Sequence, residues 1–161
     1  MGIIKLGLIS IFFLFLATVA ISLLIPSHVR ISKAINIHAD KDSVLSLIAN
    51  RRNWALWHPA FIHDESRKSF DEIRNTIRVQ NDSVIIMELN QGNKKPVING
   101  WQVYHASPDS LTLQWYMDFN QGWLPWQKFG SLFYENTYGV LMEQGLTNIK
   151  KIVQGRNDHA F

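Results

Sequence analysis

The chain has 161 residues, of which 47% are hydrophobic, and a formal net charge of +3 at pH 7. This hydrophobic content is typical of a globular protein rather than a disordered one. No run of Lys and Arg is longer than two residues, so the small positive excess does not indicate a nucleic-acid partner. Because the chain contains no cysteine, disulfides, thiolate metal sites and a cysteine nucleophile are excluded.

The N-terminal segment is strongly apolar. Leu6 to Ile25 contains no charged residue, and 14 of its 20 residues are Leu, Ile, Phe or Val. A helix of that length reaches about 30 Å, the thickness of a bilayer core. Pro26 then ends the helix. We therefore predict a membrane anchor over residues 1–26, with residues 6–25 in the lipid bilayer, and a single-pass membrane location.

A cleaved signal peptide is the alternative, because Thr18-Val19-Ala20 has the small-x-small pattern of a cleavage site. The apolar run continues five residues beyond that site, whereas the core of a signal peptide usually spans about 7–15 residues. We favour the anchor. The positive charges on the two flanks of the segment are nearly equal, with Lys5 and the amino terminus before it and Arg30 and Lys33 after it. The side of the membrane on which the soluble domain lies therefore stays open. The short linker after Ile25 predicts that the domain and its groove lie near the lipid headgroups.

The remainder is predicted to form one domain over residues 27–154, followed by a polar tail over 155–161. Alternation of apolar and polar residues predicts strands, and residues 61–72 hold too little alternation for a further hairpin. Turn-forming residues between the segments favour an antiparallel meander. The five predicted strands are His28–His38, Ile73–Gln80, Ser83–Leu89, Val97–His105 and Leu111–Phe119.

Helical spacing supplies the other elements. Asp40 is predicted to cap a helix that stops at Asn50, and a short aromatic turn or helix follows, closed before Pro59. A long C-terminal helix has an apolar stripe from Tyr138 to Val153, in which Gly145 would allow close approach to the sheet. Helices on one face of an antiparallel sheet define an α+β fold.

Four motifs resemble one known family. They are the strand Ile31–Ile37 leading into a helix, Asn53-Trp54-x-x-Trp57-x-Pro59, Leu113-Gln-Trp115-Tyr-Met117-Asp118, and Glu143-x-Gly145-Leu146-x-Asn148 in the closing helix. Together they resemble the SRPBCC superfamily, the START-like or polyketide cyclase/dehydrase group. The resemblance implies a helix-grip fold, in which the antiparallel sheet wraps around a long C-terminal helix. Membrane-anchored bacterial members also begin with an apolar helix ending in Leu-x-Pro, as Leu24-Ile25-Pro26 does here.

The resemblance implies a groove between the sheet and the C-terminal helix that binds a lipid-like or other apolar small molecule. The alternative is that the same side chains simply fill the core. The predicted ligand-binding residues are Trp54, Trp57, His58, Phe61, Trp101, Trp115, Met117, Trp126, Phe133, Tyr138 and Met142. Trp123 is a further candidate for the lining of this groove.

Two other functions stay open. A cyclase or dehydratase would need a polar group in the groove, for which His58, Tyr104 and Tyr116 are the candidates. An interaction module with a solid core is the second, because the family usually has more strands than the five placed here. We predict no catalytic residue, no cofactor and no metal, since His58 and His63 lack the spacing of a ligand pair. A His58 in a turn is expected to donate to a backbone carbonyl.

One pair of carboxylates is a candidate for a close contact between the last strand and the C-terminal helix. Asp118 and Glu143 could approach each other if the long helix crossed the last strand, although solvated surface carboxylates are the default interpretation.

Overall fold

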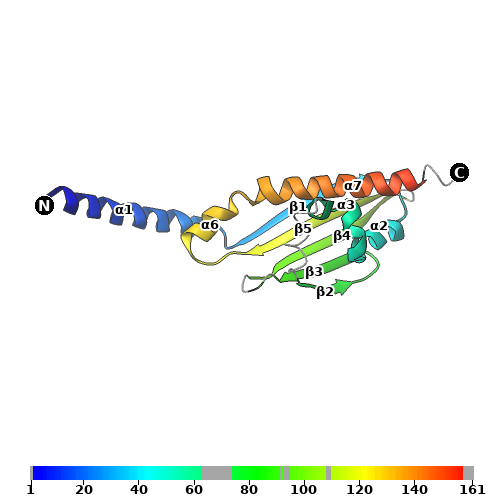
Figure 1. Ribbon diagram of the computed structural model, residues 1–161, viewed down its shortest axis with the longest axis horizontal. Coiled ribbons are helices and arrows are strands. Elements are labelled where there is room, and N and C mark those ends of the chain that lie inside the picture. Colours follow the sequence, from blue (N-terminus) through cyan, green and yellow to red (C-terminus); the bar gives the residue numbers. More distant parts are fainter. Residues whose placement is uncertain (1, 63–73, 91, 93–94, 108–109, 158–161) are drawn as a thin grey trace.

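The computed structural model describes residues 2–62, 74–90, 92, 95–107 and 110–157. A long N-terminal helix, α1 (Gly2–Leu24), projects from a domain in which one helix lies along an antiparallel sheet (Figure 1). Ile73, His63 and most of the 61–72 stretch lie outside the described residues. α1 is mostly exposed, and it has the length and composition of a membrane span or of a signal sequence.

The described residues form a five-stranded antiparallel sheet in the order β1-β5-β4-β3-β2. The prediction of an α+β fold with a meander is confirmed, because β2 to β5 follow one another in space as in sequence, and β1 closes the edge beside β5. The strands are β1 (His28–Ile37), β2 (Arg74–Gln80), β3 (Val84–Asn90), β4 (Val97–Ser107) and β5 (Ser110–Asn120).

Strand alternation explains which face of the sheet is covered. Ile31 and Ile37 of β1 are buried, as are Leu113 and Trp115 of β5. Lys33 breaks the apolar pattern of β1, and the structure supplies the reason. Its ammonium lies 2.7 Å from carboxylate oxygens of both Glu135 and Glu143, which are on the helical segment above the sheet. The two carboxylates compensate the charge at the edge of the core.

The first helix of the domain begins as predicted. Asp40 accepts hydrogen bonds from the backbone N–H groups of Asp42 and Ser43, which caps α2 (Lys41–Ala49). Asn50 ends it and then caps a short 3-10 turn, η1 (Arg51–Asn53). Two short helices follow, and they carry most of the aromatic residues of the Asn53–Phe61 segment. These helices are α3 (Trp54–Trp57) and α4 (Pro59–Ile62).

The C-terminal helix lies along the sheet, as Figure 1 shows. It consists of a π-helical turn, η2 (Glu135–Gly139), followed by α7 (Val140–Asn157). α7 extends to Asn157, into the polar tail predicted over residues 155–161. Its stripe is buried at Met142, Leu146 and Ile149, so the predicted apolar face is confirmed.

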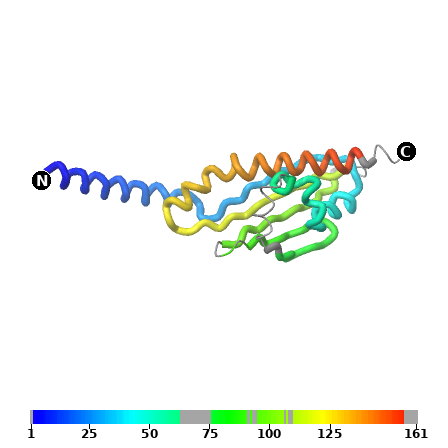
Figure 2. The backbone as a smooth tube through the Cα atoms, in the orientation of Figure 1, coloured from blue at the N-terminus to red at the C-terminus, as the bar shows by residue number. Residues whose placement is uncertain are grey.

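α6 (Pro125–Ser131) is a helix that the sequence patterns did not predict. This helix begins with Pro at its first turn, a position that Pro favours. α6 contacts α1 and lies at the junction between α1 and the rest of the domain (Figure 1 and Figure 2). It therefore connects the last strand to the C-terminal helix beside the end of α1.

Gly145 is required for the close approach of α7 to β5. A Cβ at this position would lie 2.7 Å from Cζ3 of Trp115, a ring that is fully buried. We predict that Gly145→Ala lowers the free energy of unfolding by about 1–3 kcal/mol, the usual cost of overpacking a core. Chemical denaturation measures this change.

Gly155→Ala is the matched control in the same helix, because a Cβ there meets no atom within 4 Å. Replacing a helical Gly by Ala where the added Cβ meets no atom should stabilise the protein by up to about 1 kcal/mol. Equal effects of the two substitutions would contradict the packing of α7 against Trp115.

Candidate functional site

The candidate site is an aromatic cluster between the sheet and α7. α3 supplies Trp54 and Trp57, which are buried, and its C-terminal residue His58 is 5% exposed. Asn148 of α7 donates from Nδ2 to the backbone oxygen of Trp57 at 3.0 Å. This bond ties the short helix to the long one, so the position of α3 depends on α7.

The rings of this cluster pack directly against one another. Trp57 lies with its ring centroid 5.6 Å from that of Trp115 and 6.4 Å from that of Trp101, both edge to face, and Trp101 stacks on Trp115 at 5.5 Å. His58 stacks on Trp54 with an interplanar angle of 8° and meets Phe61 edge to face at 5.1 Å. Six of the predicted ligand-binding residues are thus brought together in one buried cluster.

Three of the four buried indoles in this cluster donate a hydrogen bond. Trp54 Nε1 donates to the Ile48 oxygen at 2.7 Å and Trp57 Nε1 to the Leu47 oxygen at 3.1 Å. These carbonyls belong to the last turn of α2, where helix geometry leaves them without an intrahelical donor. Trp115 Nε1 donates to Oδ1 of the buried Asn99.

The fourth indole is different. Trp101 is fully buried, and its Nε1 has no hydrogen-bond acceptor in the part of the chain that the structure describes. A buried donor without an acceptor costs about 1–3 kcal/mol. An oxygen atom that reached this N–H would recover that energy, so Trp101 marks the one point of the cluster, among its described residues, that favours a polar atom.

His58 is a neutral polar group within the cluster. Its Nδ1 accepts a hydrogen bond from the backbone N–H of Ala60 at 3.2 Å. We had expected the ring to donate to a backbone carbonyl, but at Nδ1 it accepts. Burial lowers the pKa of His58 from its ordinary 6.5 to about 4, because the charged imidazolium would lose its hydration among aromatic rings.

The predicted residues Tyr138, Met117 and Met142 lie outside the tryptophan cluster but under the same helix. Tyr138 packs with Tyr134 and Phe119, with ring centroids 4.7–5.3 Å from it. Met117 stands between Phe119 and Trp115 on one face of β5, and Met142 is fully buried on α7. Aromatic and Met side chains therefore line the interface between β5 and the C-terminal helix.

The tryptophan cluster lies away from the α1 end of the domain, whereas the short linker had suggested a groove near that end. Gly145, which contacts Trp115, is 14 residues beyond Ser131. Figure 1 shows α3, which carries two of these tryptophans, beside α7 and away from α6 and α1. The Phe119, Tyr134 and Tyr138 group is the aromatic group nearer to α6.

The prediction that Trp126 and Phe133 line the groove is wrong. Their side chains are 64% and 66% exposed, and Trp123 is 80% exposed. The physical reason is the orientation of α6, which turns its polar Lys128 and Ser131 toward the protein. Trp126 and Phe133 consequently point away from the core.

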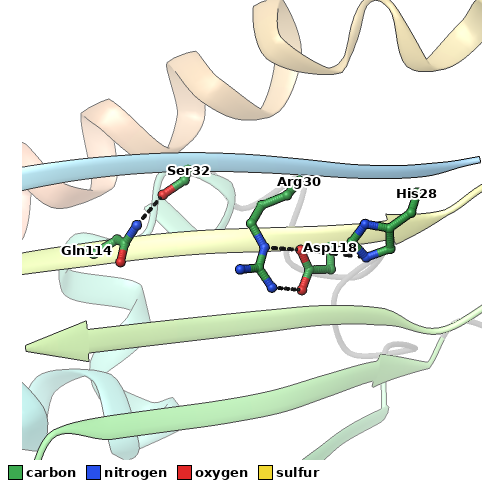
Figure 3. A network of polar contacts seen from close by, with 5 residues as sticks. All are labelled: His28, Arg30, Ser32, Gln114 and Asp118. Atoms are coloured by element: carbon green, nitrogen blue, oxygen red, sulfur yellow. Dashed lines mark hydrogen bonds and ion pairs between the residues drawn. The ribbon is translucent and has the colours of Figure 1, made fainter. Parts of the chain in front are cut away.

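The other polar candidates are on the opposite face of the sheet. Tyr104 is 46% exposed and donates to Gln114, and the Tyr116 ring lies under the guanidinium of Arg30. Asp118 accepts two hydrogen bonds of 2.6 Å from Arg30 on this face (Figure 3). Asp118 and Glu143 are therefore separated by the sheet, and of the three residues considered for an enzyme only His58 reaches the cluster.

Solved structures with the same arrangement share little sequence with this chain. A START superfamily protein from Mycobacterium smegmatis matches with a TM-score of 0.55 and 15% identity, over 78% of this chain and 97% of that one. A protein of unknown function from Staphylococcus aureus matches with a TM-score of 0.58 and 9% identity, over 81% and 96%.

A third match is the di-domain aromatase/cyclase StfQ from the steffimycin biosynthetic pathway, with a TM-score of 0.59 and 9% identity, over 81% of this chain and 52% of that one. No family model and no curated protein matches the sequence. The likenesses define the fold as START-like, of the helix-grip type. At these identities they establish the fold alone.

The low pKa of His58 makes stability depend on pH. Above pH 6.5 the ring is neutral in both folded and unfolded states, so its full contribution is present. As the pH falls toward 4 only the unfolded chain gains the proton, and the protein should lose about 3 kcal/mol of stability. Denaturation at pH 7.5 and pH 4 measures this loss.

His58→Asn is the comparison, because its amide oxygen can accept the Ala60 N–H but does not titrate in this range. The variant should lose about 3 kcal/mol less than the unmodified chain between the two pH values. An identical loss in both proteins would show that His58 is protonated in the fold.

Proposed function

We propose that this chain is a membrane-anchored START-like module that binds a lipid-like or other apolar small molecule between the sheet and α7. The observation that carries the proposal is the buried indole N–H of Trp101. An apolar molecule with one carbonyl or hydroxyl oxygen suits an aromatic interior that holds a single unsatisfied donor among its described residues. Pockets for small molecules commonly combine mostly apolar walls with a few polar groups.

Met117 and Met142 support the same proposal. Both are buried between the tryptophan cluster and the Phe119, Tyr134 and Tyr138 group. Met side chains are unbranched and flexible, so they can move aside at low energetic cost. Entry of a ligand along β5 would displace these side chains rather than the rings of Trp54, Trp57 and Trp115, which are held by hydrogen bonds.

A solid-core interaction module is the second candidate. It is favoured by the direct ring contacts of Trp57, Trp101 and Trp115, all of which are fully buried. In that case the aromatic residues contribute stability only. The two functions differ in what removal of the Trp101 N–H does, which makes this residue the natural place for a test.

Trp101→Phe removes the unsatisfied donor and keeps an aromatic ring. If a ligand oxygen accepts from Trp101, the variant should bind fatty acids and fluorescent lipid analogues about 2- to 12-fold more weakly, which corresponds to a net hydrogen bond of about 0.5–1.5 kcal/mol. Titration of the full-length chain in detergent measures the affinity, and native mass spectrometry shows whether an apolar molecule co-purifies.

Trp115→Phe is the matched control, since it leaves the buried Asn99 oxygen without its donor. This variant should lose about 1–3 kcal/mol of stability with or without ligand. A protein that is free of ligand as purified and binds no lipid analogue, with Trp101→Phe affecting neither property, would contradict ligand binding and favour the solid core.

The anchor is proposed for α1. Its residues are mostly exposed and mostly apolar, and only Ile25 to Ser27 lie between the end of α1 and β1. Phe13 and Leu16 are near the centre of the helix and exposed. Replacing both with Arg adds about 2.5–3.5 kcal/mol each to the free energy of insertion, so the variant should move to the soluble fraction after membrane separation.

The control is Leu56→Arg, at an exposed residue of α3. This variant should stay in the membrane fraction. Intact-mass analysis of the unmodified protein provides the decisive check. A mature chain that begins near Ile21 would identify the segment as a signal peptide, and the anchor would be wrong.

A further inference from the structure

The segment around α6 buries two polar side chains and exposes several large apolar ones. The side chains at Pro125, Lys128 and Ser131, spaced three residues apart, are buried. Four large apolar side chains of the same segment are exposed, by between 59% and 80%. They are Trp123, Trp126, Leu132 and Phe133.

Lys128 fixes this segment to the end of α1. Its ammonium donates to the backbone oxygens of Ser22 at 3.2 Å and Ile25 at 3.0 Å. These carbonyls belong to the C-terminal end of α1, where a positive charge interacts favourably with the helix dipole. Although Lys128 and Ser22 are far apart in sequence, the bonds hold α6 beside the last turn of the apolar helix (Figure 1).

We propose that Trp123, Trp126, Leu132 and Phe133 form a second membrane contact, which lies in the interfacial layer of the bilayer that α1 spans. This inference rests on the proposed anchor. If residues 6–25 cross the lipid, the chain leaves the hydrocarbon at Ile25, the residue that Lys128 binds. The exposed aromatic side chains therefore lie at the level where lipid tails meet headgroups.

The chemistry of the segment fits that layer. Tryptophan is enriched at membrane interfaces, because its ring is apolar and its N–H can bond to water or headgroups. The ammonium of Lys128 binds backbone oxygens at the end of α1. Ser131 donates from Oγ to the Lys128 backbone oxygen at 2.7 Å. Lys128 and Ser131 thus have their hydrogen-bond partners within the protein, and Trp126 lies on the exposed side of α6 together with Gln127.

Continuity with α1 favours the bilayer over another protein as the occupant. The exposed side chains begin where the exposed apolar surface of α1 ends, so the two surfaces form one path into the lipid. A contact at both places would fix the orientation of the domain, with α7 directed away from the membrane. A single transmembrane helix without this second contact would leave the orientation of the domain relative to the membrane surface unrestrained.

Spin labels on single cysteines test the contact, because the chain contains no cysteine of its own. Leu132→Cys reports on the segment, and Leu56→Cys on α3 is the control, since the two leucines are 59% and 55% exposed. The full chain is reconstituted in vesicles of phosphatidylcholine and phosphatidylglycerol. The label at 132 should collide several-fold more with oxygen than with a water-soluble nickel chelate, and the label at 56 should show the reverse.

A third label, at Phe13→Cys, separates this inference from the anchor. If the label at 13 lies in lipid while those at 132 and 56 are equally accessible to the nickel chelate, the second contact is overturned and the anchor stands. A label at 13 that is open to the chelate would overturn both. Adding Trp123→Gln and Trp126→Gln should shift the label at 132 toward water and leave the label at 13 in lipid. An unchanged label at 132 would also contradict the proposed contact.

Discussion

The close approach of Gly145 to Trp115 is the contact on which the rest of the domain depends. The missing side chain lets α7 lie directly on a tryptophan in the middle of β5, and Pro59 Cδ would be 3.4 Å from the same Cβ position. α4 is thereby brought to the same point, and Asn148, one turn further along α7, holds the end of α3. A larger residue at 145 would separate the helix from the sheet and disturb both short helices.

The aromatic cluster is then specified by its polar atoms rather than by its rings alone. Indoles of α3 donate to the free carbonyls of α2, and Asn99 receives the N–H of Trp115. These bonds give each ring one orientation, which the hydrophobic effect alone would not do because it is non-directional. Against that background the unsatisfied Trp101 N–H and the neutral His58 are the two polar features of the cluster that bear on a ligand.

The strands, the capped helix and the apolar face of the C-terminal helix could be predicted from the sequence, because each depends on local periodicity or on one capping residue. The role of Gly145 in the close approach of the helix to the sheet could also be predicted, because this small residue interrupts a stripe of large apolar side chains. The site was predicted in part. Trp54, Trp57 and His58 lie within a few residues of each other, and the alternation of β5 identified Trp115 as inward-facing.

Local sequence patterns did not predict α6 or the exposure of its neighbouring aromatic residues. Its inward face is polar at Lys128, whose partners are about a hundred residues away in the chain, so no local pattern reveals it. Hydrophobicity alone cannot distinguish a side chain that enters a core from one that enters a membrane, and for this reason Trp126 and Phe133 were assigned to the groove. Pro125, a residue typical of a helix start, was the one available signal.

Nuclear magnetic resonance of the indole N–H groups tests most directly whether the interior takes up an apolar molecule. In the ¹⁵N-labelled full-length chain, the Trp101 indole proton should resonate upfield of the hydrogen-bonded indole protons of Trp54, Trp57 and Trp115 before any ligand is added. Addition of a fatty acid should move the Trp101 resonance downfield by far more than the other three, because only this donor gains an acceptor. A Trp101 resonance that stays in place at saturating fatty acid, with the others equally unaffected, would contradict the account and identify the aromatic cluster as a closed core.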